Sequence, residues 1–400
     1  MTAASLDVLI PADIRFPLQR ANGVQTVKTA AALAATGMRT RLLVRESDPR
    51  PTREVLALFG VAPDAPLEVR RLRVLHRAGA FALPRASFLL QALLAGAAWL
   101  RRGGLVFTRD LQLADLLLRV PRRRGALVYE AHAVEALMYG ERGALYGTGE
   151  QPRPRKAARL RARERRVWRS ASAIVTTTAG IRDSFSDAFG PRPRVRVVPN
   201  GCDPPPAVPP PLSAEDPPRI VYAGQLYPWK GVDVLVQAVA RLPRARLVIL
   251  GGIEGERDLE RVRALVASLG LQERTEMPGL VAHDRVREEL ARAAAVVVPV
   301  LRTAMTERHT SPLKAFEAMA AGRPLVASDL PASREFLRHE QNALLVPPGD
   351  DAALGGALAR LLREPALSER IARTAFEEAP RYSWAARAAA LRGLFDEVRG

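Results

Sequence analysis

The segment from His309 to Pro324, HTSPLKAFEAMAAGRP, combines the start of a helix with charged side chains and could hold an anion. Ser311 is a good N-cap, Pro312 suits the first helical position, and a glycine and a proline follow the predicted end. The first-turn amides of Leu313 and Lys314 have no partner within a helix and lie at the positive end of its dipole. The sequence therefore predicts an anion site at the start of this helix.

Two charged side chains of this segment, Lys314 and Glu317, lie three residues apart and could face the same ligand. The alternative is an ion pair between them, worth about 0.2–0.5 kcal/mol on a helix surface. For Lys314 alone the ion pair is favoured. Glu317 stands beside Phe316 and Met319, where a carboxylate needs hydroxyl or amide partners, and ribose hydroxyls would supply them.

A second candidate segment, IVYAGQLYPWKG over 220–231, has the composition of a strand followed by a loop. Gly224 permits a ligand to approach the backbone closely, and Lys230 offers a flexible point charge to a diphosphate. Lysine is scarce, because only Lys28, Lys156, Lys230 and Lys314 contribute to the 60 lysines and arginines. Two of them fall in these two segments. A turn lysine in water remains the alternative for Lys230.

Short runs rich in Val, Ile and Leu alternate with longer Ala-rich stretches, a pattern typical of βαβ units with mostly parallel sheets. Strands are predicted near 6–10, 40–45, 68–74, 105–108, 126–130, 173–177, 194–198, 219–223, 246–250, 295–299 and 324–327. Helices are predicted near 24–35, 86–100, 111–119, 155–169, 179–188, 231–241, 256–269, 284–293, 312–321, 351–363 and 384–398. The helix over 312–321 follows a buried strand, so its start should lie at the carboxyl edge of a sheet, where such folds bind ligands.

Length and composition divide the chain into two domains. Its 400 residues, with 48% hydrophobic content, exceed the size of one ordinary domain. Repeated prolines over 201–218 predict a linker between an N-terminal domain (1–200) and a C-terminal domain (219–380). The last helix, in 381–400, is expected to cross back to the N-terminal domain.

Charge and cysteine usage bear on compartment and partners. The net charge of +18 invites a nucleic-acid hypothesis, but arginine is spread throughout and no base-reading motif is present, so no nucleic-acid partner is predicted. The positive charge favours anionic partners such as nucleotide diphosphates and acidic lipid headgroups. Cys202 is the only cysteine, and the N-terminus lacks the pattern of a secretion signal. These features predict a cytoplasmic protein.

Two segments raise the question of membrane contact. The apolar stretch over 81–100 contains Arg85 and Gln91 and is predicted to be a core helix rather than a membrane span. The basic segment over 153–169, with Leu160, Val167 and Trp168 as its apolar members, is expected to be a solvated helix face. The alternative is a helix resting on an anionic bilayer at the inner face of the membrane.

These motifs together resemble glycosyltransferase family 4, and the resemblance runs over nearly the whole chain. SPLKAFEAMAAGRPLVASDLPASREFL with NALLVPPGD is similar to the donor-site block of the subgroup with an S-P-L-K-x-F-E motif, and YAGQLYPWKGVDVL to the loop that receives the donor diphosphate. ANGVQTVKTAAALAATGMRTRLLV resembles the opening glycine loop and helix, and YEAHAVEALM a segment of the inner rim. The resemblance implies a GT-B fold, with two Rossmann-like α/β domains whose mostly parallel sheets face a central cleft.

The resemblance also implies roles for individual residues. It assigns the nucleotide ribose to Glu317, the diphosphate to Lys230, and the distal phosphate to the amides of Ser311, Leu313 and Lys314. It places His132 against the donor sugar near the reacting centre, and Asn22 and Gly23 beside the acceptor and phosphate. Gly224, Gln225 and His309 complete the implied donor site.

The chain departs from the family pattern at two of these positions. The family pairs two glutamates eight residues apart, whereas His309 stands eight before Glu317 and Glu307 is displaced by two. Gln225 occupies a position that usually holds an arginine, and Arg302, Arg308 or Arg323 could supply the missing charge.

The resemblance implies a retaining, metal-independent transfer of a sugar from a UDP- or GDP-sugar to a hydroxyl of a glycan or lipid-linked acceptor. Cell-surface polysaccharide or glycolipid synthesis is the expected setting, with the nucleotide sugar as co-substrate and no other cofactor. The two departures motivate an alternative, a catalytically weakened sugar-nucleotide-binding or scaffold protein. A UDP-sugar epimerase is a further alternative on the same fold.

Overall fold

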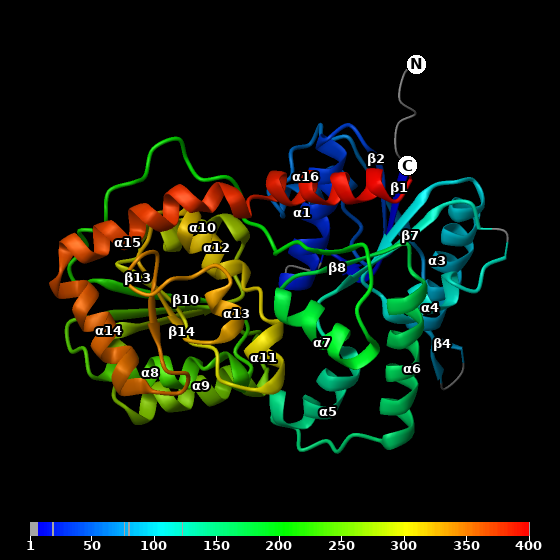
Figure 1. Cartoon of the computed structure of the whole chain (residues 1–400). Helices are drawn as coiled ribbons and strands as arrows, with labels where there is room; N and C mark the ends of the chain where they lie inside the picture. Colours follow the sequence, from blue (N-terminus) through cyan, green and yellow to red (C-terminus); the bar gives the residue numbers. More distant parts are fainter. Residues whose placement is uncertain (1–6, 18–19, 76, 79–80, 122, 400) are drawn as a thin grey trace. The chain divides into compact units, whose positions relative to one another are not determined.

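The computed structural model describes residues 7–17, 20–75, 77–78, 81–121 and 123–399. The chain forms two units, coloured along the sequence in Figure 1. Unit 1 comprises Met1–Ala136, Arg153–Pro199 and Trp384–Gly400, and unit 2 comprises Leu137–Pro152 and Asn200–Ser383. The proline-rich segment predicted as a linker therefore groups with unit 2, and so does 137–152, which the sequence analysis assigned to the N-terminal domain.

Unit 1 is built on a parallel sheet of seven strands in the order β3-β2-β1-β6-β7-β8-β9. Its strands are β1 (Asp7–Phe16), β2 (Arg39–Glu46), β3 (Leu67–Leu72), β6 (Leu105–Thr108), β7 (Ala126–Ala131), β8 (Ala173–Thr176) and β9 (Val195–Val197), and a short hairpin pairs β4 (Arg77–Ala78) with β5 (Phe81–Ala82). The order reverses between β1 and β6, so a crevice is expected where these two strands end.

Helices cover both faces of this sheet. They are α1 (Ala21–Ala35), α2 (Thr52–Ala57), α3 (Pro84–Arg101), α4 (Leu111–Leu117), α6 (Pro154–Ser170), α7 (Ala179–Phe189) and the terminal α16 (Trp384–Glu397). One face packs α1, α2 and α16 into a common core, in which Phe395 of α16 contacts Phe107 of β6. The last helix is thus part of unit 1, although the chain reaches it only after completing unit 2 (Figure 1).

Unit 2 contains a six-stranded parallel sheet in the order β12-β11-β10-β13-β14-β15. Its strands are β10 (Arg219–Ala223), β11 (Arg246–Leu250), β12 (Thr275–Gly279), β13 (Ala295–Val298), β14 (Leu325–Ser328) and β15 (Leu344–Val346). Alternate residues of β10 face opposite sides, since Ile220 and Tyr222 join one core whereas Val221 and Ala223 join the other. This is why the central strands are apolar throughout.

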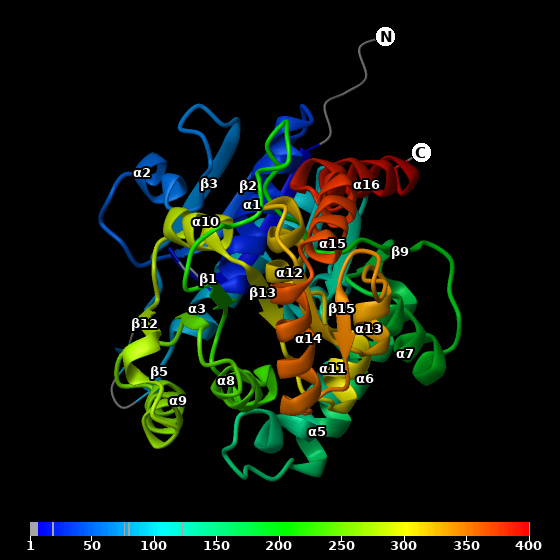
Figure 2. The ribbon, with the colours of Figure 1, turned by 90° about the vertical axis from the view of Figure 1, so that its left-hand side faces the viewer.

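The helices of unit 2 form two layers around its sheet (Figure 2). They are α8 (Val232–Ala240), α9 (Arg257–Ser268), α10 (His283–Arg292), α11 (Ala304–His309), α12 (Leu313–Ala320), α13 (Pro331–Arg334), α14 (Asp351–Arg363) and α15 (Pro365–Glu378), with 3₁₀ turns η1 (Pro228–Lys230), η2 (Gln272–Arg274) and η3 (Ala379–Tyr382). Helices α8, α9 and α14 pack on one face, while α10, α12 and the end of α15 pack on the other.

Helix α5 (Glu135–Leu145) begins in unit 1, and most of its length belongs to unit 2. Glu141 accepts hydrogen bonds from the amides of Ala304 (3.1 Å) and Met305 (3.0 Å), at the start of α11. Tyr146, just after the helix, contacts Tyr227 with ring centroids 5.0 Å apart. These contacts explain why 137–152 groups with unit 2.

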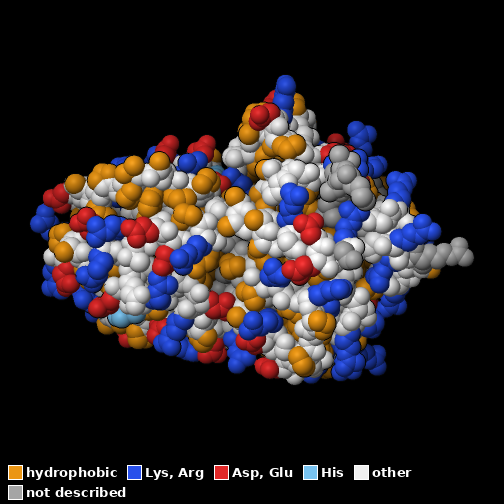
Figure 3. All heavy atoms as spheres, turned by 45° about the horizontal axis from the view of Figure 1, so that its top comes forward, with side chains coloured by type: hydrophobic (Ala, Val, Ile, Leu, Met, Phe, Trp, Pro, Cys, Tyr) orange, Lys and Arg blue, Asp and Glu red, His pale blue; other side chains and the backbone are white. Residues whose placement is uncertain are grey.

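The basic segment forms α6, as predicted, and two of its apolar members are committed to the protein interior. Val167 and Trp168 are buried, and Trp168 stacks on Phe185 and donates a hydrogen bond to the carbonyl of Gly190 (2.9 Å). These two side chains cannot enter a bilayer without leaving the core, so the packing favours the solvated helix face. On the face drawn in Figure 3, basic side chains are scattered among acidic ones rather than gathered in one patch.

The stretch predicted as a core helix forms α3, which packs against β1 and β6. In the described part of the chain, no helix combines the length and the apolar character needed to cross a bilayer. The predicted fold class of two Rossmann-like units with parallel sheets is confirmed.

Candidate functional site

In unit 2, the strand order reverses between β10 and β13, and the loops that follow these strands carry the predicted donor residues. Gly231 has φ 70°, and a Cβ there would lie 1.8 Å from the carbonyl oxygen of Pro299 after β13. The amide of Leu301 also donates a hydrogen bond to the carbonyl of Trp229 (2.9 Å). Glycine at this position therefore lets the two loops meet at the carboxyl edge of the sheet.

Lys230 lies in this junction without an anionic partner among the described residues. Its Nζ lies 4.0 Å from the centroid of the Trp229 ring. Burial lowers the pKa of Lys230 to about 8. An ammonium group held in a partly desolvated place without a carboxylate is suited to bind a ligand anion.

Gly224 has a packing role that the sequence did not predict. A Cβ at this position would lie 2.9 Å from the hydroxyl oxygen of Tyr222, and that hydroxyl donates to the carbonyl of Gln225 (2.6 Å). The glycine thus leaves room for the tyrosine that fixes its own loop. Close approach of a ligand at Gly224 stays a prediction.

The start of α12 differs by one residue from the prediction. Pro312 with φ −79° and ψ 117° is the N-cap, and the helix begins at Leu313, so the assignment of Ser311 as N-cap was wrong. Ser311 is engaged elsewhere, because its Oγ accepts from the amide of Asn200 (3.1 Å) and its carbonyl accepts from Asn200 Nδ2 (2.7 Å). Proline has no side-chain acceptor, so the first turn has no side-chain cap, and the amides of Leu313 and Lys314 lie at an open helix start.

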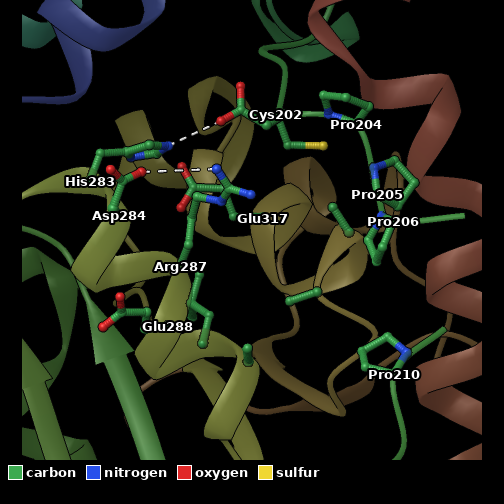
Figure 4. A pocket seen from close by; sticks show the side chains of 15 residues that line it. Cys202, Pro204, Pro205, Pro206, Pro210, His283, Asp284, Arg287, Glu288 and Glu317 are labelled. Carbon is green, nitrogen blue, oxygen red and sulfur yellow. Dashed lines mark hydrogen bonds and ion pairs between the residues drawn. The ribbon is translucent and has the colours of Figure 1, made fainter. Parts of the chain in front are cut away.

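Glu317 and Lys314 form the ion pair that was the alternative to ligand binding, with Nζ 2.5 Å from Oε2. The Glu317 side chain is only 10% exposed, so this pair is not an ordinary surface pair. Glu317 also lines a cavity of about 610 Å³, drawn in Figure 4. The glutamate therefore has one protein partner and access to a space that could hold a ligand.

Three segments of unit 2 enclose this cavity. They are the first residues of the proline-rich segment, helix α10 and helix α12, which contribute Cys202, Asp203, Pro204, Pro205, Pro206, Pro210, His283, Asp284, Arg287, Glu288, Leu290, Ala291, Glu317, Ala320 and Ala321. His283 Nε2 lies 3.2 Å from Asp203 Oδ2 and joins α10 to the proline-rich segment (Figure 4). The lining thus combines apolar prolines and alanines with a few charged groups.

His309 is the last residue of α11, and its side chain is 5% exposed. Burial, together with the charge of Arg308, lowers the pKa of His309 to about 4, so its imidazole is neutral at physiological pH. Glu307 bonds to Arg302 (2.5 Å), which leaves neither residue free, and Arg323 donates to the carbonyl of Pro211 (2.7 Å). Position 309 therefore holds a neutral imidazole where the resemblance implies a glutamate carboxylate.

Three buried polar atoms near these loops have no hydrogen-bond partner within the described residues. They are Gln225 Oε1, Trp229 Nε1 and Thr310 Oγ1, from the segments that follow β10 and β13. Buried polar atoms are normally satisfied, so a polar ligand is a natural partner for them. Trp229 and Thr310 were not predicted from the sequence, where their only signal was their place beside Lys230 and Ser311.

In unit 1, His132 follows β7 and lies over a buried charge network. Its Nε2 is 3.1 Å from Glu130 Oε2, off the line of a well-aligned hydrogen bond. Glu130 also contacts Gln25 Nε2 (3.3 Å) and an Nη2 of Arg387. Burial lowers the pKa of His132 to about 4, and Arg109 contributes. The histidine is therefore neutral at physiological pH.

Burial alone would raise the pKa of Glu130. Arg387, His132 and Arg109 outweigh that effect and hold this pKa well below its usual range. The carboxylate beside His132 is therefore kept ionised. The role of His132 against a donor sugar stays a prediction.

Asn22 and Gly23 lie in the first turn of α1, with Gly23 buried and Asn22 exposed. Asn22 lines a cavity of about 350 Å³ at the carboxyl edge of the first sheet, and His132 is not among its described lining residues. The structure thus brings Asn22 together with the charged side chains Asp13, Arg85, Arg109, Asp110, Glu135 and Arg163.

Two family models of glycosyltransferases match this chain, one over most of unit 1 and one over most of unit 2. Residues 22–201 match the family described as "Glycosyl transferase 4-like domain", and residues 217–364 match "Glycosyl transferases group 1". A D-inositol 3-phosphate glycosyltransferase from Acidothermus cellulolyticus is 30% identical over 279 residues, which cover 64% of this chain and 59% of that protein.

Solved structures resemble the whole chain. Sucrose-phosphate synthase from Thermosynechococcus elongatus superposes with a TM-score of 0.74 at 21% identity, covering 99% of both chains. Anabaena HepE, solved with UDP-glucose, gives a TM-score of 0.70 at 17% identity, covering 98% of this chain and 100% of that one. At these identities the likeness shows the fold, which is GT-B. With both domain families matched in order, the chain belongs to glycosyltransferase family 4.

Proposed function

We propose that this protein transfers a sugar, with retention of configuration, from a UDP- or GDP-linked donor to an acceptor hydroxyl. Two observations carry the proposal: Lys230, after β10, lacks a carboxylate partner among the described residues, and α12, which follows the adjacent strand β13 along the chain, starts without a side-chain cap. An ammonium and free amides at a helix start together suit a diphosphate. The unpartnered atoms of Gln225, Trp229 and Thr310 add polar groups to the same loops.

The nucleoside of the donor fits the cavity that Glu317 lines. Prolines and alanines offer flat apolar contacts to a base, while the glutamate can accept hydrogen bonds from ribose hydroxyls. Lys314 orients the Glu317 carboxylate through a 2.5 Å contact, and Glu317 still lines the cavity. The ion pair and ribose binding are therefore compatible in this proposal.

The chemical difficulty is the departure of a nucleoside diphosphate while positive charge grows at the anomeric carbon. Lys230 and the α12 amides would stabilise the leaving group, as preorganised donors do in oxyanion holes. The reaction proposed here uses no metal ion. A phosphate oxygen of the leaving group can take the acceptor proton, so no side-chain base is required.

The setting we propose is synthesis of a cell-surface polysaccharide or glycolipid in the cytoplasm. HepE was solved with UDP-glucose, and the Acidothermus protein is named for an inositol phosphate acceptor. The matched region spans 59% of that relative's length.

A panel of UDP- and GDP-sugars tests the proposal by thermal shift, followed by transfer assays with the donors that bind. A donor present at about 100 times its Kd should stabilise the protein by about 2.7 kcal/mol. Glu317→Ala and Lys230→Ala should each reduce this stabilisation and slow the release of nucleoside diphosphate. Stabilisation that is undiminished in both variants would contradict the proposed site.

A sugar-nucleotide-binding or scaffold protein remains the second candidate, and one observation favours it. The neutral, buried His309 and the Arg302-bound Glu307 leave the donor sugar without the carboxylate that the family places there. Tight donor binding by the wild-type protein with no hydrolysis or transfer for any donor would favour this candidate over the enzyme.

A further inference from the structure

The cavity of about 350 Å³ in unit 1 lies where the strand order of its sheet reverses. Its lining comes from the carboxyl-terminal half of β1 and the segments that follow β6 and β7, together with the starts of α1, α3 and α4 and one side of α6. Open α/β sheets bind ligands at such switch points. Its volume is at the lower end of the ~300–1,000 Å³ typical of ligand pockets, which suits a single ring.

The charges around this cavity balance. Three carboxylates and three guanidinium groups line it: Asp13, Asp110, Glu135, Arg85, Arg109 and Arg163. Most carboxylate capacity is already used, because Arg85 bridges Asp13 and Asp110, and Asp110 also caps α4 by accepting from the amide of Leu113 (2.9 Å). Such a lining offers both donors and acceptors of hydrogen bonds without a net charge.

Glu135 is the exception among these carboxylates. Its amide donates to Glu164 Oε1 (2.5 Å), but within the described residues its own carboxylate has no hydrogen bond or ion pair. Burial raises the pKa of Glu135, and the charge of Arg109 opposes this shift. The carboxylate is thus partly desolvated, lines the cavity and lacks a protein partner.

Arg109 is the complementary donor. One of its nitrogens donates to Gln25 Oε1 (3.3 Å), and it feels the charge of Glu135 without forming an ion pair with it. A group that both donates and accepts, such as a hydroxyl, can bridge a carboxylate and a guanidinium that do not touch.

We propose that this cavity is the acceptor subsite and that Glu135 and Arg109 bind the hydroxyls of an uncharged, ring-shaped polyol such as a monosaccharide or cyclitol. The balanced charge disfavours a phosphorylated ring at this position, since a net positive lining would be needed to attract it. This inference rests on the proposed glycosyl transfer and specifies the acceptor class of that reaction.

The test compares wild type with Glu135→Gln, which removes the charge and keeps the shape. Saturation-transfer NMR with myo-inositol and methyl α-D-glucopyranoside should show binding to wild type and a signal reduced at least about tenfold in the variant, the scale of a hydrogen bond to a charged group. Glu68→Gln, an exposed glutamate of β3, is the matched control and should behave as wild type. No saturation transfer from wild type to either polyol, or equal transfer from wild type and Glu135→Gln, would overturn the assignment.

Kinetics separate this inference from the proposed function. Glu135→Gln should lower kcat/KM for the polyol acceptor about 10- to 100-fold while donor hydrolysis without acceptor stays within about twofold. An equal fall in both rates would show that Glu135 serves the donor or the fold and would overturn the subsite. If wild type neither binds nor hydrolyses any donor, the proposed function fails, and the NMR experiment still decides the polyol site. Binding of myo-inositol 1-phosphate more than about tenfold tighter than myo-inositol would contradict the uncharged class.

Discussion

At the scale of single residues, the burial of Lys230 should make the affinity for UDP depend on pH. Burial lowers its pKa to about 8, so in the ligand-free protein the charged form is lost as the pH rises through 8. Because a diphosphate binds the charged form, the Kd for UDP should rise between pH 7 and pH 9, by about tenfold per unit above 8.

Titration calorimetry of UDP across this pH range checks the expectation. Lys230→Met should bind UDP more weakly at pH 7 and lose the pH dependence, and Lys28→Met, on a buried lysine outside the candidate site, is the control. A wild-type Kd that does not change between pH 7 and pH 9 would contradict the role of Lys230.

Glu317 should recognise the nucleoside and not the phosphates. Replacing it with Gln removes the carboxylate that accepts from ribose hydroxyls and leaves Lys314 without its ion-pair partner. The Kd for UDP should therefore rise about tenfold, the scale of a hydrogen bond to a charged group, while binding of inorganic pyrophosphate stays equal or becomes tighter. Calorimetry with both ligands decides the question. Equal weakening of both would show that Glu317 only supports the fold of α12.

At the scale of elements, Glu164 of α6 ties the start of α5 to unit 1. Its side chain is fully buried, and its Oε1 accepts from the amide of Glu135. Burial raises the pKa of Glu164 to about 7 from an ordinary value of 4.5. Between these two values the folded protein binds more protons than the unfolded chain, so its stability should fall as the pH rises.

This shift corresponds to about 3 kcal/mol of free energy of unfolding lost between pH 4.5 and pH 8. Glu164→Gln removes the titration, so the variant should gain stability relative to wild type as the pH rises through this window. Denaturant unfolding at pH 5 and pH 8 measures the difference, and the exposed Glu68→Gln should show none. A stability difference that is independent of pH would contradict the raised pKa.

The bounds of helices were predicted correctly where a long hydrophobic pattern marks them. They were missed where contacts between distant segments set the helix start. Helix α14 was predicted with the bounds 351–363 that the structure gives, since Asp350 supplies a side-chain cap. The start of α12 was displaced because Asn200, more than a hundred residues away, occupies Ser311. Short α11 was overlooked although Thr303 and Thr306 form a local capping box at its start, and Glu141 of α5 accepts hydrogen bonds from two more amides of its first turn. Helix α15 was overlooked, although Pro365, Leu367 and Ile371 follow a helical pattern.

Only part of the candidate site could be predicted from the sequence, because local motifs reveal residues and not the packing around them. Lys230, Glu317 and the helix start came from local motifs. Their environments, such as the ion pair of Glu317 and the burial of His309, depend on packing between distant segments. Glu135 and Arg109 carry no motif of their own and become visible only when three strand ends meet around one cavity.

At the scale of the whole molecule, Arg387 fastens the last helix to unit 1. It is 3% exposed and bonds to Glu130, to Thr29 Oγ1 (3.0 Å) and to the carbonyls of Val198 (2.8 Å) and Pro199 (2.7 Å). The two carbonyls belong to the last residues of unit 1 before the chain enters unit 2. One side chain therefore holds both the exit and the return of the chain in place.

Removing this guanidinium leaves the Glu130 carboxylate buried without its main partner, which typically costs about 3–5 kcal/mol. Arg387→Met should therefore lower the free energy of unfolding of unit 1 by this amount, measured by denaturant titration. The double variant Arg387→Met with Glu130→Gln should recover part of the loss because no buried charge remains. A single variant as stable as wild type would contradict the anchoring role.

The most direct test of the central claim is a time course of transfer followed by proton NMR, with an α-linked nucleotide sugar and a polyol acceptor. The wild-type protein should form an α-linked product, and Lys230→Met should form it about 10²–10³ times more slowly, the scale of losing one preorganised donor to a leaving group. A β-linked product, or transfer by Lys230→Met at the wild-type rate, would contradict the proposed mechanism.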